Sequence, residues 1–223
     1  MQSHATPETW PRGRFVRRNT AIERPSLVPE VALHLASEVT PLWQLTEAEL
    51  SATGLAPPYW AFAWAGGQAL ARYLIDNPAL VADQDVLDLG SGSGLVAIAA
   101  KLCGAAQVTA ADIDPFSVAA IRLNAWLNKV RVTATGADLL AEPLTDWPVI
   151  CAADIWYEGP TARQAGARLR TAAAEGRLVL VGDPGRHHLP KQGLEELATY
   201  RVPVSRDLED CSVACTRVWR MLP

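Results

Sequence analysis

The glycine-rich segment at residues 85–100, "DVLDLGSGSGLVAIAA", constrains the fold of this chain more than any other feature. An apolar run of β character ends at Leu89, three glycines follow at alternate positions, and a run with helical spacing begins at Leu95. Glycine allows a tight turn and lets backbone N–H groups come close to a ligand. The segment therefore predicts a strand, a ligand-binding loop and a helix in direct succession.

Beyond this loop, segments with strand character alternate with segments of helical periodicity. Strands are predicted at residues 85–90, 107–114, 131–138, 147–158 and 177–185, and helices at 94–104, 115–128, 161–176 and 190–200. A further helix is predicted from Gly67 to Asn77, before the first of these strands. Alternating strands and helices indicate a parallel, doubly wound sheet.

The C-terminal part adds two more strands, at residues 201–207 and 211–222, joined only by "LED". So short a polar join pairs them as a hairpin, so one of the two must run antiparallel. The expected fold is α/β, with a Rossmann-like sheet of seven strands and mixed direction. Residues 1–55 are expected to form a small, partly helical N-terminal extension, irregular over its first 24 residues, and residues 56–223 the main domain.

Composition excludes several classes of function. The chain is 49% hydrophobic, 20% charged and carries a net charge of −4, which is unlike a general nucleic-acid binder. Its four cysteines show no metal-site spacing, and no apolar run is long enough to span a membrane. No apolar segment of a secretory signal follows the basic N-terminus. We expect a monomer without a metal, in the reducing cytoplasm rather than the mitochondrial matrix.

The spacing of the loop glycines distinguishes between nucleotide ligands. Nicotinamide cofactors favour G-x-G-x-x-G, whereas Gly90, Gly92 and Gly94 form G-x-G-x-G. Asp88 precedes the loop, and Asp112 ends the second strand, where a carboxylate can accept both ribose hydroxyls of an adenosine. This arrangement resembles the class I, seven-stranded methyltransferases that use S-adenosylmethionine. The resemblance implies cofactor contacts from the loop, including Ser91, and from Asp112 with its neighbour Ile113.

Two further segments are expected at the same edge of the sheet. Asp138 follows the third strand and either contacts the adenine amino group or forms an Asx turn. Asp154 and Tyr157 follow the fourth strand as D-x-x-Y, without the prolines typical of enzymes that methylate nucleic-acid bases. A carboxylate can orient a lysine ammonium and an aromatic ring can face it; the alternatives are a helix cap for Asp154 and core packing for Tyr157.

Ahead of the loop, residues 57–78, "PPYWAFAWAGGQALARYLIDNP", hold Trp60 and Trp64. If this segment is helical, the two indoles lie on one face, either over the cofactor sulfonium or packed under the sheet. Arg186 in "GDPGR" is interpreted as a solvated arginine of a β-turn, with a contact to a ribose or to an acidic group of a partner as the alternative.

Several blocks together resemble the lysine methyltransferases of the electron transfer flavoprotein β-subunit. They are residues 57–78, "VLDLGSGSGLVAIAAKLCGA", "ADIDP", "DIWYE", "LVGDPGR" and the terminal "TRVW". The resemblance implies S-adenosylmethionine as donor, S-adenosylhomocysteine as product and lysines of that β-subunit as acceptors. It also implies cofactor contacts from Trp60, Trp64 and Asp88, and acceptor contacts from Asp154 and Tyr157. A similarity to the ribosomal protein L11 methyltransferase in "LDLGSGSG" leaves open that the substrate is another protein. A small-molecule substrate is a further alternative.

Overall fold

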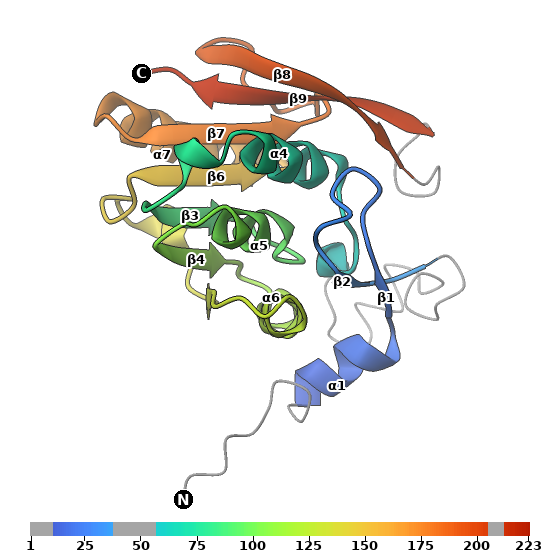
Figure 1. The fold of residues 1–223 in the computed structure, drawn as a ribbon. Coiled ribbons are helices and arrows are strands. Elements are labelled where there is room, and N and C mark those ends of the chain that lie inside the picture. Colours follow the sequence, from blue (N-terminus) through green and yellow to red (C-terminus); the bar gives the residue numbers. More distant parts are fainter. Residues whose placement is uncertain (1–10, 38–56, 205–211) are drawn as a thin grey trace, which may run out of the picture.

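The computed structural model describes residues 11–37, 57–204 and 212–223 (Figure 1). Helices are α1 (Pro11–Arg18), α4 (Ala65–Asp76), α5 (Leu95–Leu102), α6 (Pro115–Leu127) and α7 (Gly159–Ala174), with short 3-10 turns η2 (Tyr59–Ala61), η3 (Pro78–Leu80) and η4 (Leu139–Ala141). Strands are β1 (Ala21–Glu23), β2 (Leu33–Leu35), β3 (Asp85–Leu89), β4 (Gln107–Ala111), β5 (Thr133–Thr135), β6 (Val149–Ala153), β7 (Leu178–Asp183), β8 (Leu194–Pro203) and β9 (Val213–Met221).

Seven of the strands form one sheet in the order β5-β4-β3-β6-β7-β9-β8, and β1 and β2 form a separate antiparallel pair. Strands β3 to β7 run parallel, whereas β9 lies antiparallel to both β7 and β8. The predicted α/β architecture, the seven strands and the single reversal are therefore confirmed. Parallel strands bring all their carboxyl ends to one edge, which is where ligands bind in such sheets.

Both faces of the sheet are covered, and the strands alternate accordingly. On β3 and β6, Val86 and Cys151 face the cluster formed by α4 and α5, while Leu87 and Ile150 face α7. Such two-sided burial explains why these strands are apolar without interruption. Figure 1 shows α4 and α5 over the near face and α7 behind the sheet.

One predicted helix is wrong. Residues 190–200 were expected to be helical because "LEELA" favours that state, but Leu194–Pro203 form strand β8. The strand pairs with β9 from Leu194 opposite Met221 to Pro203 opposite Val213, with one irregularity between Glu196 and Ala198. Pairing with a neighbour at the sheet edge overrides the local helical preference.

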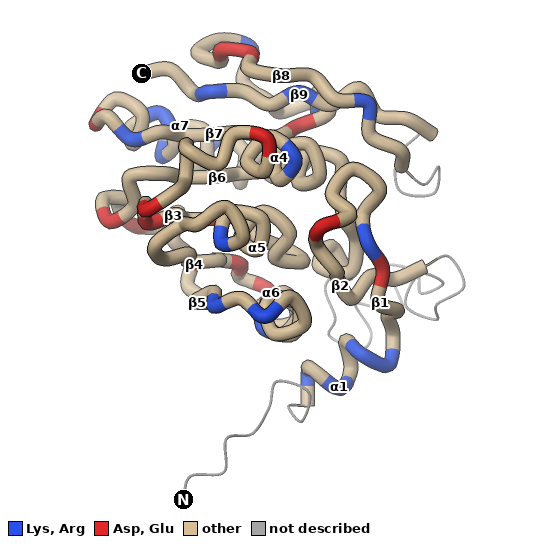
Figure 2. Tube along the Cα trace, viewed as in Figure 1, with Lys and Arg blue, Asp and Glu red and all other residues tan. Residues whose placement is uncertain are grey.

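The N-terminal segment is more regular than expected over residues 11–24, since it contains α1 and β1. Helix α1 packs on α6 through Phe15 and Val16. Its arginines 12, 14, 17 and 18 are exposed, so its outer side is basic although the chain is acidic as a whole (Figure 2). The helix-start residues at 46–54 and the proposed boundary near residue 55 lie outside the described residues.

Asparagines of α6 tie the N-terminal segment to the domain. The fully buried Asn124 accepts a hydrogen bond from His34 N at 2.8 Å and donates one to Ser93 O at 2.8 Å. Asn128 accepts from Ala32 N at 2.9 Å. On the edge of β2 that faces away from β1, side-chain amides of α6 thereby take the place of the backbone hydrogen-bond partners that another strand would supply. Among the described residues, no helix is long and apolar enough to cross a membrane.

Candidate active site

A cavity of about 410 Å³ opens at the carboxyl edge of the parallel strands. Its walls come from the segments that follow β3, β4, β5, β6 and β7, and from the segment that leads into α4. Of the twelve predicted site residues, eight line it: Trp64, Gly90, Gly92, Asp112, Ile113, Asp138, Asp154 and Tyr157. The other four, Trp60, Asp88, Ser91 and Gly94, lie behind these walls.

The glycine loop is held from beneath by the strand that precedes it. The buried Asp88 accepts hydrogen bonds from Ser91 Oγ at 2.5 Å and from Ala97 N, in the first turn of α5, at 3.0 Å. Burial raises the pKa of Asp88 to about 6. Asp88 and Ser91 therefore fix the shape of the loop and do not line the cavity themselves.

Glycine is required in this loop by its backbone angles. Gly90 and Gly94 have φ values of 69° and 84°, a region that other residues rarely adopt. A Cβ on Gly90 would also meet Ile155 Cγ2 at 2.6 Å, and one on Gly94 would press on Ile121. Gly90 and Gly92 consequently form a bare backbone wall of the cavity, and Gly94 lets α5 pack closely on α6.

Asp112 stands at the end of β4 with its carboxylate across the loop. It accepts hydrogen bonds from Gly92 N at 2.8 Å and from Asp114 N at 2.9 Å. Burial raises its pKa, while these two N–H groups and the Ser117 side chain oppose the rise. A carboxylate has about four acceptor positions, so Asp112 retains capacity toward the cavity.

The far end of the cavity combines an apolar side chain with a polar one. Ile113 is 74% exposed, which is unusual for isoleucine, and it borders the cavity. Asp138 is exposed, begins η4 and accepts from Leu140 N at 3.0 Å. The Asx turn, one of the two alternatives for Asp138, is thus present, and Asp138 also lines the cavity.

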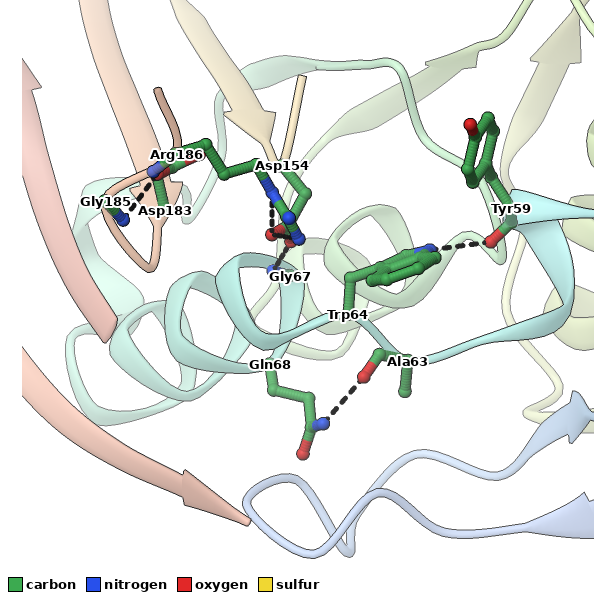
Figure 3. Close-up of polar contacts among 9 residues, drawn as sticks. All are labelled: Tyr59, Ala63, Trp64, Gly67, Gln68, Asp154, Asp183, Gly185 and Arg186. Carbon is green, nitrogen blue, oxygen red and sulfur yellow. Dashed lines mark hydrogen bonds and ion pairs between the residues drawn. The ribbon is translucent and has the colours of Figure 1, made fainter. Parts of the chain in front are cut away.

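The two tryptophans of the opening segment have different surroundings. Trp60 is 2% exposed in η2 and stacks on Phe116 of α6, with ring centroids 6.3 Å apart. Trp64 is half-buried, lines the cavity and donates from Nε1 to Tyr59 O at 2.9 Å (Figure 3). The chain is extended at residues 62 and 64 between η2 and α4, so the indoles do not share one helical face.

Asp154 occupies the loop after β6 in a left-handed conformation, with φ of 56°. Its Oδ2 accepts from Gly67 N, in the first turn of α4, at 2.8 Å. Its Oδ1 is paired with Arg186, with Nη2 at 2.9 Å and Nε at 3.3 Å (Figure 3). Burial raises the pKa of Asp154, whereas Arg186 and the Gly67 N–H lower it.

Arg186 therefore belongs to the site, and its interpretation as a solvated arginine of a turn is wrong. Its guanidinium lies 5.5 Å from the centre of the Trp64 ring and borders the cavity. The buried Asp183 fixes the turn, since its Oδ1 accepts from Gly185 N and Arg186 N, both at 2.6 Å. Burial raises the pKa of Asp183 to about 6.

Aromatic rings complete the wall beside Asp154. Tyr157 is 51% exposed and its ring centroid lies 5.2 Å from that of Tyr59, which lies 6.0 Å from that of Trp64. Burial, followed by the neighbouring Tyr59, raises the pKa of Tyr157. Sequence reasoning missed Tyr59, although it stands in the quoted aromatic segment between Pro58 and Trp60.

Comparisons with known proteins agree with this geometry. The family model for Ribosomal protein L11 methyltransferase (PrmA) matches residues 69–153. Electron transfer flavoprotein beta subunit lysine methyltransferases are 38% identical in Danio rerio and 37% in Xenopus laevis. These alignments cover 92% and 100% of this chain, and 81% and 92% of the relatives. The chain belongs to the family of electron transfer flavoprotein beta subunit lysine methyltransferases. The resemblance inferred from the sequence blocks is confirmed.

Solved structures support the fold of this methyltransferase. Magnesium protoporphyrin IX methyltransferase from Synechocystis, with bound S-adenosylhomocysteine, matches with a TM-score of 0.51 and 16% identity, over 70% of this chain and 81% of that one. A Thermoplasma acidophilum protein matches with a TM-score of 0.54 and 19% identity, over 70% and 89%. The L11 match ends at residue 153, before Asp154, Tyr157 and Arg186, so it concerns the glycine-loop half of the cavity.

Proposed function

We propose that this protein transfers methyl groups from S-adenosylmethionine to lysine side chains of the electron transfer flavoprotein β-subunit. The observation that carries the proposal is the single cavity that joins the glycine loop and Asp112 to Asp154 and Tyr157. A site for an adenosine-type donor thereby opens directly onto a site for a basic acceptor. The relatives of this length and identity are named for the same reaction.

The residues of the cavity fit the donor. Gly90 and Gly92 offer bare backbone, the remaining acceptor capacity of Asp112 suits ribose hydroxyls, and Asp138 suits an adenine amino group. Ile113 supplies an apolar surface for the face of a purine ring. Trp64 presents an aromatic ring, which stabilises a nearby cation by about 0.5–2 kcal/mol. Trp60, Asp88, Ser91 and Gly94 support these residues from behind.

At the acceptor end, Asp154 orients the lysine nitrogen, and Tyr59 and Tyr157 border its path. When bound, the donor supplies a methyl group on a sulfonium, whose C–S bond breaks as the N–C bond forms. The chain contributes mainly by positioning the amine and excluding water around it.

In the described part of the chain, Cys103, Cys151 and Cys215 are free, which fits action in a reducing compartment. We propose the cytoplasm, and a monomeric enzyme.

Mass spectrometry of purified β-subunit, after incubation with the enzyme and donor, tests the proposal. We expect a mass increase of 14 Da per methyl group on lysine peptides, and none with Asp154→Asn enzyme. Ribosomal protein L11, incubated in parallel, is the second acceptor to examine because its methyltransferase family matches residues 69–153. Methylation of L11 alone would contradict the proposed substrate and leave the proposed chemistry standing.

A further inference from the structure

The carboxylate at the acceptor end of the cavity already has a cationic partner. Arg186 Nη2 lies 2.9 Å from Asp154 Oδ1, and the guanidinium carbon lies 5.5 Å from the centre of the Trp64 ring. Thus the residue proposed to attract a lysine ammonium is one half of an ion pair, and the aromatic ring beside it faces the other half (Figure 3).

Both ends of Arg186 are held in place. Its backbone N–H donates to Asp183 Oδ1 at 2.6 Å, and its side chain, only 19% exposed, lies between Asp154 and Trp64. If the guanidinium left, the 9% exposed Asp154 side chain would lose its cationic partner. Breaking a buried pair in this way is strongly unfavourable. An incoming lysine therefore meets the pair intact.

An intact pair changes what the acceptor nitrogen experiences. A free lysine has a pKa near 10.4, so at neutral pH its nitrogen is protonated and has no lone pair for attack. A bare carboxylate would stabilise that charged form further, whereas an adjacent guanidinium destabilises it. Oδ1 of the carboxylate accepts from Arg186 and Oδ2 from Gly67 N, and the Gly66 N–H also stabilises the charged form, so an amine N–H would share an oxygen that already has a donor.

We infer that Arg186 is a positioning residue that keeps the acceptor amine neutral while Asp154 orients it through one hydrogen bond. This role rests on the proposed lysine methylation, and it specifies which charges act on the acceptor nitrogen. The ammonium proton leaves to water before attack. The nitrogen lone pair then forms the N–C bond as the C–S electron pair stays with sulfur.

Other charged groups around the pair define the pH range for a test. Asp183 lies close to both partners, and burial raises its pKa to about 6. Tyr157 faces Arg186 and Asp112 from the other side, and burial raises its pKa above the ordinary value near 10. From pH 7 to about pH 9, Asp183 stays ionised and Tyr157 stays protonated, so a change in rate there reports the acceptor amine.

The experiment compares single-turnover rates of β-subunit methylation between pH 7 and 10.5 for wild type, Arg186→Lys and Arg186→Gln. We expect a wild-type midpoint at least about one pH unit below that of free lysine, and a shift to higher pH by about one unit in Arg186→Gln. Arg186→Lys retains the charge and should keep the wild-type midpoint. Arg163→Gln removes an exposed arginine of α7 outside the cavity and should also leave the midpoint unchanged.

Loss of folded enzyme at high pH would move the apparent midpoint down, so lower stability of Arg186→Gln cannot imitate a shift to higher pH. An unshifted midpoint in Arg186→Gln, whatever its rate, would overturn the role of Arg186. If that variant does not fold, a wild-type midpoint at or above about 10.4 overturns the role. A lower midpoint shared by Arg186→Lys supports it. Absence of methylation by the wild type at every pH would instead contradict the proposed function.

Discussion

Asp88 and Asp183 are buried carboxylates that hold loops at the ends of β3 and β7. Burial raises the pKa of each to about 6, above the value near 4 of an unfolded chain. The folded protein therefore binds these protons more tightly than the unfolded chain does. Their contribution to the free energy of unfolding is fully present below about pH 4 and is lost as pH rises through about 6.

Asp183→Asn removes one of these titrations and keeps an oxygen for the Gly185 and Arg186 N–H groups. The free energy of unfolding of wild type, relative to this variant, should fall by about 2–3 kcal/mol between pH 4 and pH 7. Urea denaturation at several pH values measures it. A difference that stays constant over this range would show that Asp183 titrates normally.

The two tryptophans allow a matched pair of substitutions. Trp60→Ala removes a buried indole from the contact with Phe116 and should lower the free energy of unfolding by about 3–5 kcal/mol. Trp64→Ala should cost much less stability but reduce kcat/KM for methylation by about tenfold, through loss of its cation-facing ring. Urea denaturation and methylation kinetics of both variants give the comparison. Equal losses of stability would contradict the different roles.

At the scale of elements, the glycine pair in the first turn of α4 sets how closely this helix crosses β7. A Cβ on Gly66 would lie 2.3 Å from Gly182 O and 2.6 Å from Asp154 Oδ2. A Cβ on Gly182 would lie 2.3 Å from Gly66 O in return. Backbone contact between helix and strand brings Gly67 N within 2.8 Å of Asp154. The close packing that these glycines allow therefore also holds Asp154 at the acceptor end of the cavity.

Gly66→Ala and Gly67→Ala test this crossing, since the second site has room. At Gly67 the nearest atoms to an added Cβ are 4.0 Å away. Gly67→Ala should be neutral or stabilise by up to about 1 kcal/mol through helix propensity. Gly66→Ala should destabilise by about 1–3 kcal/mol, because the backbone of β7 cannot move aside. Thermal unfolding distinguishes the two, and a well-tolerated Gly66→Ala would refute the close crossing.

For the whole molecule, donor and product binding should stabilise the complete fold, because the cavity walls come from five successive strand ends and the segment before α4. S-adenosylhomocysteine at 100 times its Kd should add about 2.7 kcal/mol to the free energy of unfolding. Asp112→Ala should abolish most of this increment, since it removes the carboxylate assigned to the ribose. Calorimetric unfolding with and without the product measures it. An undiminished increment in Asp112→Ala would remove Asp112 from the binding site.

Local sequence determined the succession of strands, loops and helices along the chain. Glycines 90, 92 and 94, the apolar strands and Asp114 before Pro115 each specify their own structure through short-range physics. Asp114 caps α6, accepting from Phe116 N at 2.8 Å. A parallel sheet then brings the strand ends together, which is why Asp112, Asp138, Asp154 and Tyr157 could be assigned to one site from their positions alone.

Tertiary structure decided what local patterns left open. Residues 194–200 became part of a strand because β9 offers them backbone partners, although a helix was predicted there. Trp60 and Trp64, similar in sequence context, were separated by a turn that buries one and leaves the other in the cavity. Arg186 joined the site because Asp183 folds the turn that carries it to Asp154, 32 positions earlier in the chain. Each outcome depends on a partner distant in sequence, and such partners are fixed only when the chain is packed.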